Sequence, residues 1–139
     1  MNADWMRTIK AVESRVGGRL FLLWSDGTAG EIGCPTAAAS ATAPLRLGDW
    51  GHSLVWEDGF ELEADSLWLD TLDAIGRSDA RCFLEWRLTN GLSLAKAAEA
   101  LGLARRTVAY YSNGDRAVPK TVLLACKGWD ATRPAKKAA

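Results

Sequence analysis

The chain has 139 residues, of which 48% are hydrophobic and 24% charged, and its 17 Lys and Arg balance its 17 Asp and Glu. Such proportions are ordinary for a soluble globular protein of one domain or two small ones. No run reaches the roughly 18 apolar residues of a membrane span, and the N-terminal MNADWMRTIK lacks the apolar stretch of a signal peptide. We therefore expect a cytoplasmic protein.

Cysteine, histidine and carboxylate usage argues against metal and catalytic chemistry. Cys34, Cys82 and Cys126 are far apart and have no histidine nearby, so we expect mostly buried, reduced thiols and neither a disulfide nor a zinc site. The only histidine, His52, lies in a turn-like Gly-His-Ser context that favours a structural role over a general base. The carboxylates of residues 57–65 are expected on a solvated hairpin face or a surface for a basic partner. We expect no enzyme activity, no metal and no cofactor.

The neutral net charge conceals an asymmetry between two halves of the chain. Residues 1–75 hold five Lys and Arg against twelve Asp and Glu, a net charge of −7, and residues 76–139 hold twelve against five, a net charge of +7. A basic half is typical of a surface that binds nucleic acid. The alternative is that the two halves attract each other electrostatically.

The N-terminal half begins with a predicted antiparallel arrangement of strands. Residues 8–14 are expected to form a first strand, and the continuous apolar run in residues 19–25 predicts a central strand covered on both faces. Asp26-Gly27 predicts a tight hairpin turn, with positive φ at both residues, before a return strand at residues 29–32.

A second β-rich segment follows. Residues 34–43 carry only small side chains around prolines and are expected to form a loop or a short helix. Residues 54–56 and 60–63 flank an Asp-Gly turn and predict a hairpin with one solvated face. Asp65 is expected to cap a helix over residues 67–74, which Gly76 ends.

Together these pieces resemble a small β-rich domain of uncharacterised function that bacterial genomes carry alone or in front of a helix-turn-helix. The resemblance covers about residues 3–75 and rests on the segments LFLLWSDGT and GHSLVWEDGFELEADSLW. It implies a DNA-binding regulator or an antitoxin-like protein. Core filling is the expected role of most of the seven tryptophans, and a Trp-lined ligand or partner site in this domain is the alternative.

From Asp79 the apolar period changes to about 3.6 residues, which predicts helices. Ser78 is expected to cap the first helix, and Asn90-Gly91 to end it. Its inward-facing residues are expected to be Cys82, Phe83, Trp86 and Leu88.

Ser93 is expected to cap the second helix, and Gly102 to end it with a positive φ. The apolar face of that helix would comprise Leu94, Ala97, Ala98 and Leu101. Pro119 fits the first turn of a fourth helix over residues 121–129. That helix would contribute Val122, Leu123, Cys126 and Trp129 to the core.

The third helix, expected over residues 104–113, has two contrasting faces. Val108 and Tyr111 are expected to point into the core with the preceding Leu103. The opposite face would present Arg105, Arg106, Ala109, Tyr110 and Asn113. Because an α-helix fits the DNA major groove, two arginines in its first turn are placed to contact guanine. A solvated arginine pair is the alternative.

Residues 79–129 resemble the phage-repressor or Cro (Xre-like) type of helix-turn-helix, through the segment GLSLAKAAEALGLARRTVAYYSNGDRAVPKT. The resemblance implies structural roles for Ala98, Gly102 and Val108. It implies contacts with the groove or with phosphates for Arg105, Arg106, Thr107 and Tyr110. Leu94 departs from the pattern, which usually has a polar residue there, often glutamine, and Ser112 departs from a common glutamate. Other donors would then contact phosphate: Ser93, Lys96, Asn113, Arg116 or Lys120.

The sequence therefore predicts an α+β protein with a small antiparallel β-rich domain at residues 1–76, an all-α helix-turn-helix bundle at 77–130 and a disordered basic tail at 131–139. Its expected function is sequence-specific transcriptional regulation by binding double-stranded DNA as a homodimer, because a single helix contacts too few base pairs. The candidate DNA-binding residues are Ser93, Lys96, Ala104, Arg105, Arg106, Thr107, Tyr110, Asn113, Arg116 and Lys120. The alternative is an antitoxin-like module whose acidic N-terminal domain binds a partner protein.

Overall fold

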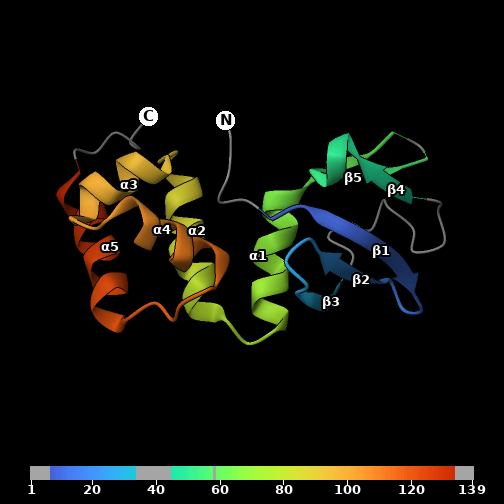
Figure 1. Cartoon of the computed structure of the whole chain (residues 1–139), viewed down its shortest axis with the longest axis horizontal. Coiled ribbons are helices and arrows are strands. Elements are labelled where there is room, and N and C mark those ends of the chain that lie inside the picture. Colours follow the sequence, from blue (N-terminus) through green and yellow to red (C-terminus); the bar gives the residue numbers. More distant parts are fainter. Residues whose placement is uncertain (1–6, 34–44, 58, 134–139) are drawn as a thin grey trace. The chain divides into compact units, whose positions relative to one another are not determined.

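The computed structural model describes residues 7–33, 45–57 and 59–133 of the chain. The chain divides into two compact units, Met1–Gly76 and Arg77–Ala139. Among the described residues, the first unit has two antiparallel sheets of three strands, a 3-10 turn and one α-helix, and the second has four α-helices (Figure 1). The predicted α+β fold class is confirmed.

The first sheet has the order β1-β2-β3, with strands β1 (Ile9–Arg15), β2 (Arg19–Trp24) and β3 (Ala29–Gly33). β2 is central, as predicted, but only its Leu20, Leu22 and Trp24 face is fully buried. On the other face Arg15 lies over the ring of Phe21, 4.3 Å from its centroid. The predicted covering of both faces is therefore complete on one face and partial on the other, where Phe21 and Leu23 are half-buried.

The turn between β2 and β3 lies at Asp26-Gly27, as predicted, and its geometry differs from the expected one. Gly27 has φ 95°, whereas Asp26 has a negative φ. The Asp26 carboxylate instead accepts hydrogen bonds from the backbone N–H and the hydroxyl of Thr28, at 3.0 and 2.9 Å. This side-chain turn replaces the second positive φ that the sequence suggested.

The second sheet has the order β4-β5-β6, with strands β4 (Leu45–Gly48), β5 (Ser53–Trp56) and β6 (Glu61–Glu63). The β5–β6 hairpin and its solvated acidic face were predicted, whereas β4 and the 3-10 turn η1 (Asp49–Gly51) were not. Asp58, which was expected in the turn of this hairpin, and residues 34–43, which were expected to form a loop or short helix, lie outside the described residues.

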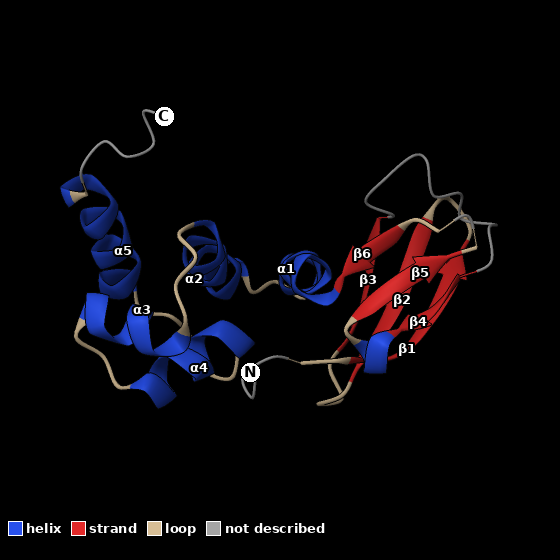
Figure 2. Ribbon diagram, turned by 90° about the horizontal axis from the view of Figure 1, so that it is seen from above, coloured by secondary structure: helices blue, strands red, loops and turns tan. Residues whose placement is uncertain are grey.

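Helix α1 (Ala64–Ala74) follows β6 directly and lies beside the strands (Figure 2). It starts three residues earlier than expected and its N-cap is Glu63, so the prediction that Asp65 caps it was wrong. In the core, Trp24 packs edge-to-face against Trp68 with centroids 4.9 Å apart, and its indole N–H donates to Thr71 Oγ1 at 3.1 Å. The polar atom of a buried indole thus has a partner.

The second unit comprises α2 (Ser78–Thr89), α3 (Leu94–Leu101), α4 (Arg105–Asn113) and α5 (Lys120–Thr132). They enclose a core that contains Phe83, Trp86, Ala97, Ala98, Val108, Tyr111, Val118 and Cys126. No helix within the described ranges has the length and hydropathy needed to cross a membrane.

Several details of the predicted helices were wrong. Ser78 is the first residue of α2 rather than its cap, and Pro119 is the N-cap of α5 rather than a residue of its first turn. Cys82 is exposed, while Leu84 and Arg87 occupy the buried face in addition to Phe83 and Trp86. α5 continues to Thr132, into the segment expected to be a disordered tail, and residues 134–139 lie outside the described residues.

Candidate functional site

The segment from α3 to α4 has the local geometry that its sequence predicted. Ser93 caps α3, with its hydroxyl accepting from the backbone N–H of Lys96 at 3.1 Å. Gly102 ends α3 in the left-handed conformation, φ 71°, and the Leu103 N–H then bonds to the Ala98 carbonyl at 3.0 Å. The small residues Ala97 and Ala98 are buried where α3 packs in the core. This geometry starts α4 three residues after Gly102.

The N-terminus of α4 differs from that of α3 because no side chain caps it. Its N-cap is Ala104, which has no hydrogen-bonding group to offer the first-turn N–H groups. Arg105 and Arg106 follow directly and are exposed, and neither guanidinium makes an ion pair or hydrogen bond within the described part of the chain. Two positive charges therefore lie at the positive end of the helix dipole, which is locally unfavourable. An anion at this point would satisfy the N–H groups and offset the charge.

The outward face of α4 continues through Tyr110 to Arg116. Arg106 and Tyr110 are four residues apart and so lie on one face of the helix. The Arg116 guanidinium, from the loop after α4, lies over the Tyr110 ring, 4.2 Å from its centroid. The structure thus brings three of the predicted site residues into one continuous line, while the neighbouring Thr107 is half-buried.

Asn113 is not on this outward face, and that prediction was wrong. The residue is 7% exposed because the last turn of α4 packs inward, and its Oδ1 is buried without a hydrogen-bond partner. Ser112 is fully buried as well. Its hydroxyl accepts from Arg87 at 2.9 Å and donates to the Val108 carbonyl at 2.8 Å. The small serine at this position is therefore explained by packing.

The remaining predicted donors are spread over other elements. Lys96 is exposed on α3, and Leu94 is half-buried against the core rather than available to a ligand. The Ser93 hydroxyl oxygen accepts the Lys96 N–H as the cap of α3, at the exposed start of that helix. Lys120 is exposed at the start of α5 and lines a groove between α2 and α5. We therefore assign Lys120 to that groove and not to the surface formed by Arg106, Tyr110 and Arg116.

The loop that carries Arg116 is held by two residues that the sequence analysis missed, Arg77 and Asp79. The two side chains form a two-pronged ion pair, with Arg77 Nε 3.1 Å from Asp79 Oδ1 and an Arg77 terminal nitrogen 3.3 Å from Oδ2. The terminal nitrogens of Arg77 also donate to the carbonyls of Gly114, at 2.5 Å, and Arg116, at 3.1 Å. Asp79 Oδ2 accepts from the Val118 N–H at 2.8 Å. One indication of this pair was present in the sequence: two residues of opposite charge, Arg77 and Asp79, stand two positions apart where a helix was expected to begin.

Partial burial opposes ionisation of Asp79, and its hydrogen bonds outweigh that effect. Burial would raise the pKa of this carboxyl group, but hydrogen bonds from Arg77 and from the N–H groups of Val118 and Ala80 hold the pKa below its usual value. The Asp79 carboxylate is therefore charged at neutral pH and can accept from all three donors.

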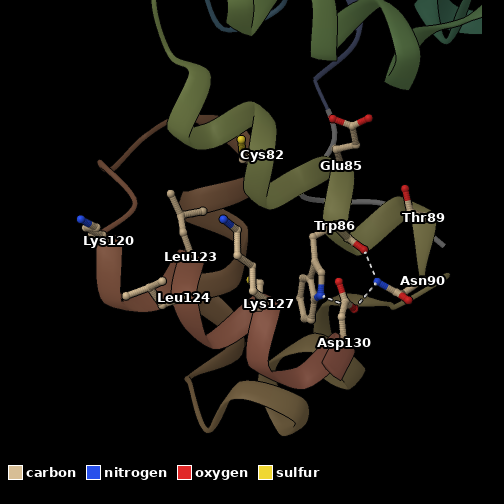
Figure 3. Close-up of a pocket in the computed structure, with 11 residues that line it drawn as sticks. Cys82, Glu85, Trp86, Thr89, Asn90, Lys120, Leu123, Leu124, Lys127 and Asp130 are labelled. Carbon is tan, nitrogen blue, oxygen red and sulfur yellow. Dashed lines mark hydrogen bonds between the residues drawn. The ribbon is translucent and has the colours of Figure 1, made fainter. Parts of the chain in front are cut away.

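The groove between α2 and α5 has a volume of about 540 Å³ and is lined mostly by apolar atoms (Figure 3). At one end the indole N–H of Trp86 and the amide of Asn90 both donate to Asp130 Oδ1, at 3.1 and 3.3 Å.

Burial, helped by the charge of Asp130, raises the pKa of the Cys126 thiol to about 11, so this cysteine is protonated and unreactive at neutral pH. No group of three potential metal ligands occurs among the residues described.

In the first unit, three tryptophans fill the core and one does not. Trp24, Trp56 and Trp68 are buried, which fits the expected core role. Trp50 is 91% exposed and has a left-handed backbone, φ 60°. Trp5 lies outside the described residues. The alternative of a Trp-lined site in this unit stays a prediction.

These features define an α+β protein in which a β-rich unit precedes a four-helix unit with an exposed, basic helix start. The chain is similar to a candidate DNA-binding protein of Nitrosomonas europaea of known crystal structure, with 32% sequence identity, a TM-score of 0.63 and coverage of 97% of this chain and 94% of that one. The chain belongs to the same family as this Nitrosomonas protein. No protein-family model matches the chain, and a search of the curated proteins found no match to it.

Proposed function

We propose that this protein is a non-enzymatic, sequence-specific DNA-binding regulator, in which α3, Gly102 and α4 form a repressor-type helix-turn-helix and α4 enters the major groove. The name of the Nitrosomonas relative, which covers nearly the whole chain, supports DNA as the partner. The net charge of +7 on residues 76–139 supports an anionic partner for the helical unit. In this arrangement Arg105 and Arg106 contact base edges, and Arg116 contacts phosphate.

The observation that carries this proposal is the open N-terminus of α4. Ala104 leaves the first-turn N–H groups without a cap, and Arg105 and Arg106 add positive charge at the same end. The missing cap and the two first-turn arginines both lower the stability of the folded protein. A Ser or Asp cap and acidic first-turn residues would each raise it. Residues that break a local rule without a structural gain are expected at functional sites. DNA supplies both the phosphate and the guanine acceptors that would compensate for this cost.

We further propose that the protein binds DNA as a homodimer. One helix contacts only a few base pairs, and two copies on half-sites one helical turn apart multiply the discrimination. An operator with two-fold symmetry is therefore expected. The competing proposal, an antitoxin-like module that uses the acidic unit to hold a partner protein, requires no such operator.

The proposal is tested by selecting bound sequences from a random duplex pool and measuring the affinity of the best one. Arg105→Ala and Arg106→Ala are each expected to weaken binding to the selected duplex by about 1–3 kcal/mol and to relax the preference at one base pair. Their thermal stability should be unchanged or slightly raised, because each removes a positive charge from the helix start. Lys127→Ala is the matched control, since it removes an exposed positive charge from α5.

Two outcomes would contradict this proposal. If the pool yields no enriched sequence and affinity depends on salt alone, binding is not sequence-specific. If the arginine variants lose affinity equally for all duplexes, the arginines contact only phosphate. Co-purification of the full chain with a small basic protein, combined with no duplex binding, would favour the antitoxin-like alternative.

Substitution of Ala104 by aspartate should change stability and DNA binding in opposite directions. Ala104→Asp is expected to raise the free energy of unfolding by about 1 kcal/mol, since its carboxylate can accept from the first-turn N–H groups. The same carboxylate would repel a phosphate there and weaken DNA binding by about tenfold, which corresponds to 1.4 kcal/mol. Urea denaturation and duplex titration measure the two effects. Ala104→Ser, a neutral cap, should stabilise the helix with a smaller loss of affinity, and a gain of affinity in Ala104→Asp would contradict the proposed site.

A further inference from the structure

The loop between α4 and α5, residues 114–119, contains neither helix nor strand, yet its backbone is bound at three points by side chains from the start of α2. The Arg77 guanidinium donates to the carbonyls of Gly114 and Arg116, and the Asp79 carboxylate accepts from the Val118 N–H. Arg77 and Asp79 also bind each other through two hydrogen bonds. A planar guanidinium paired in this way has a fixed orientation. The path of the loop is therefore set by this pair.

The fixed path of the loop also restricts the position of the Arg116 side chain. Arg77 bonds to the backbone carbonyl of Arg116 itself, and the Arg116 guanidinium lies 4.2 Å from the centroid of the Tyr110 ring. One end of the residue is anchored to α2 and the other to α4. An exposed arginine loses rotamer freedom when it binds an anion, and the two contacts of Arg116 lower that entropic cost. Through its contact with Tyr110, which lies one turn after Arg106, Arg116 lies beside the face of α4 that carries both residues.

We propose that Arg77 and Asp79 are positioning residues that hold Arg116 over Tyr110 as a preorganised phosphate contact, an inference that rests on the proposed DNA-binding function. Arg116 supplies the charge that meets the DNA backbone. Arg77 and Asp79 do not touch DNA and act only through the loop. Leu94 stands where repressor-type domains usually have a polar residue, and the Arg116 contact compensates for the donor that is missing from α3.

Asp79→Asn separates positioning from simple electrostatics, because the two predict opposite signs. The substitution removes a negative charge, so a purely electrostatic effect would tighten DNA binding. If Asp79 positions Arg116, the substitution instead loosens the loop and weakens binding by about tenfold. The full chain is titrated with the selected duplex at several salt concentrations, at a temperature where urea denaturation shows every variant to be folded. Tighter or unchanged binding by Asp79→Asn would overturn the inference.

A double-mutant cycle completes the test. Arg116→Ala is expected to lower the slope of log affinity against log salt concentration by about one, as the loss of one phosphate contact requires. Asp79→Asn is expected to produce the same loss of slope, and the combination of both no further loss, because they remove one contact. Additive effects, or an unchanged slope in Arg116→Ala, would contradict the positioning role. If the unaltered protein binds no duplex at all, the proposed function itself fails, and the two failures are thereby distinguished.

Discussion

Arg87→Ala is expected to lower the free energy of unfolding of the helical unit by about 3–5 kcal/mol, as measured by urea denaturation followed at 222 nm. Arg87 is only 3% exposed, and burial lowers the pKa of its guanidinium to about 10, so the side chain is still charged at neutral pH. Its Nε donates to the Leu92 carbonyl at 3.1 Å and a terminal nitrogen to Ser112 Oγ at 2.9 Å. Truncation would leave a cavity and remove a donor from both groups.

Two further variants separate packing from hydrogen bonding at this position. Arg87→Met keeps most of the volume and removes the donors, so it should retain a loss of about 1–3 kcal/mol from the groups left without a partner. Arg81→Ala, on the same helix, removes a half-buried arginine that pairs with Glu85 at 3.4 Å, and should cost less than about 1 kcal/mol. If Arg87→Met were as stable as the unaltered protein, Arg87 would serve only to fill space.

The features predicted correctly from the sequence are those that neighbouring residues determine. Gly102 ends α3 with a positive φ and Ser93 caps it, since both effects involve groups within a few residues. The Asp26-Gly27 hairpin is local in the same way. The α+β class was predicted from the change in the spacing of apolar residues near residue 79. Such periodicity is a reliable indicator of secondary structure when it extends over long segments.

The features that were missed depend on contacts between residues far apart in the chain. Arg87 and Ser112 are 25 residues apart, and Arg77 reaches loop carbonyls 37 and 39 residues away. A lone arginine in a helix resembles solvated charge, although Arg87 lies four residues after Phe83 and so falls within the apolar stripe. The prediction for Asn113 was wrong for the same reason. Packing against other helices, rather than the local sequence, determines which face of the last turn of α4 is buried.

For the candidate site, the sequence identified the chemistry but not the way it is held in place. Arg105, Arg106 and Tyr110 were predicted from the helical period, and they are accessible or half-buried on α4. The stacking of Arg116 on Tyr110 requires the loop to turn back toward α4, which no local pattern indicates. The support for that loop comes from the start of α2, so the DNA-facing surface that we propose depends on an element outside the predicted motif.

The β-rich unit carries the second large expected effect, at Gly51. This glycine has φ 84°, and a Cβ built there would lie 2.5 Å from the Ile9 carbonyl oxygen and 3.4 Å from Thr8 Cβ. The turn after β4 therefore touches the start of β1, where the two sheets meet. Gly51→Ala adds a backbone clash to the cost of a positive φ, and we expect a loss of about 2–5 kcal/mol in the free energy of unfolding.

Gly17→Ala is the matched control because Gly17 has almost the same φ, 82°, and open space where its Cβ would lie. It should cost about 1–2 kcal/mol, the conformational penalty alone. The difference between the two variants, measured by thermal and urea denaturation of the full chain, is thus the cost of separating the two sheets at Ile9. Equal losses would mean that β1 and the turn move apart freely, and that the two sheets are not rigidly joined at this point. Since Gly51 lies in the first unit, its substitution should leave the urea midpoint of the Arg87-dependent helical transition unchanged if the two units unfold independently.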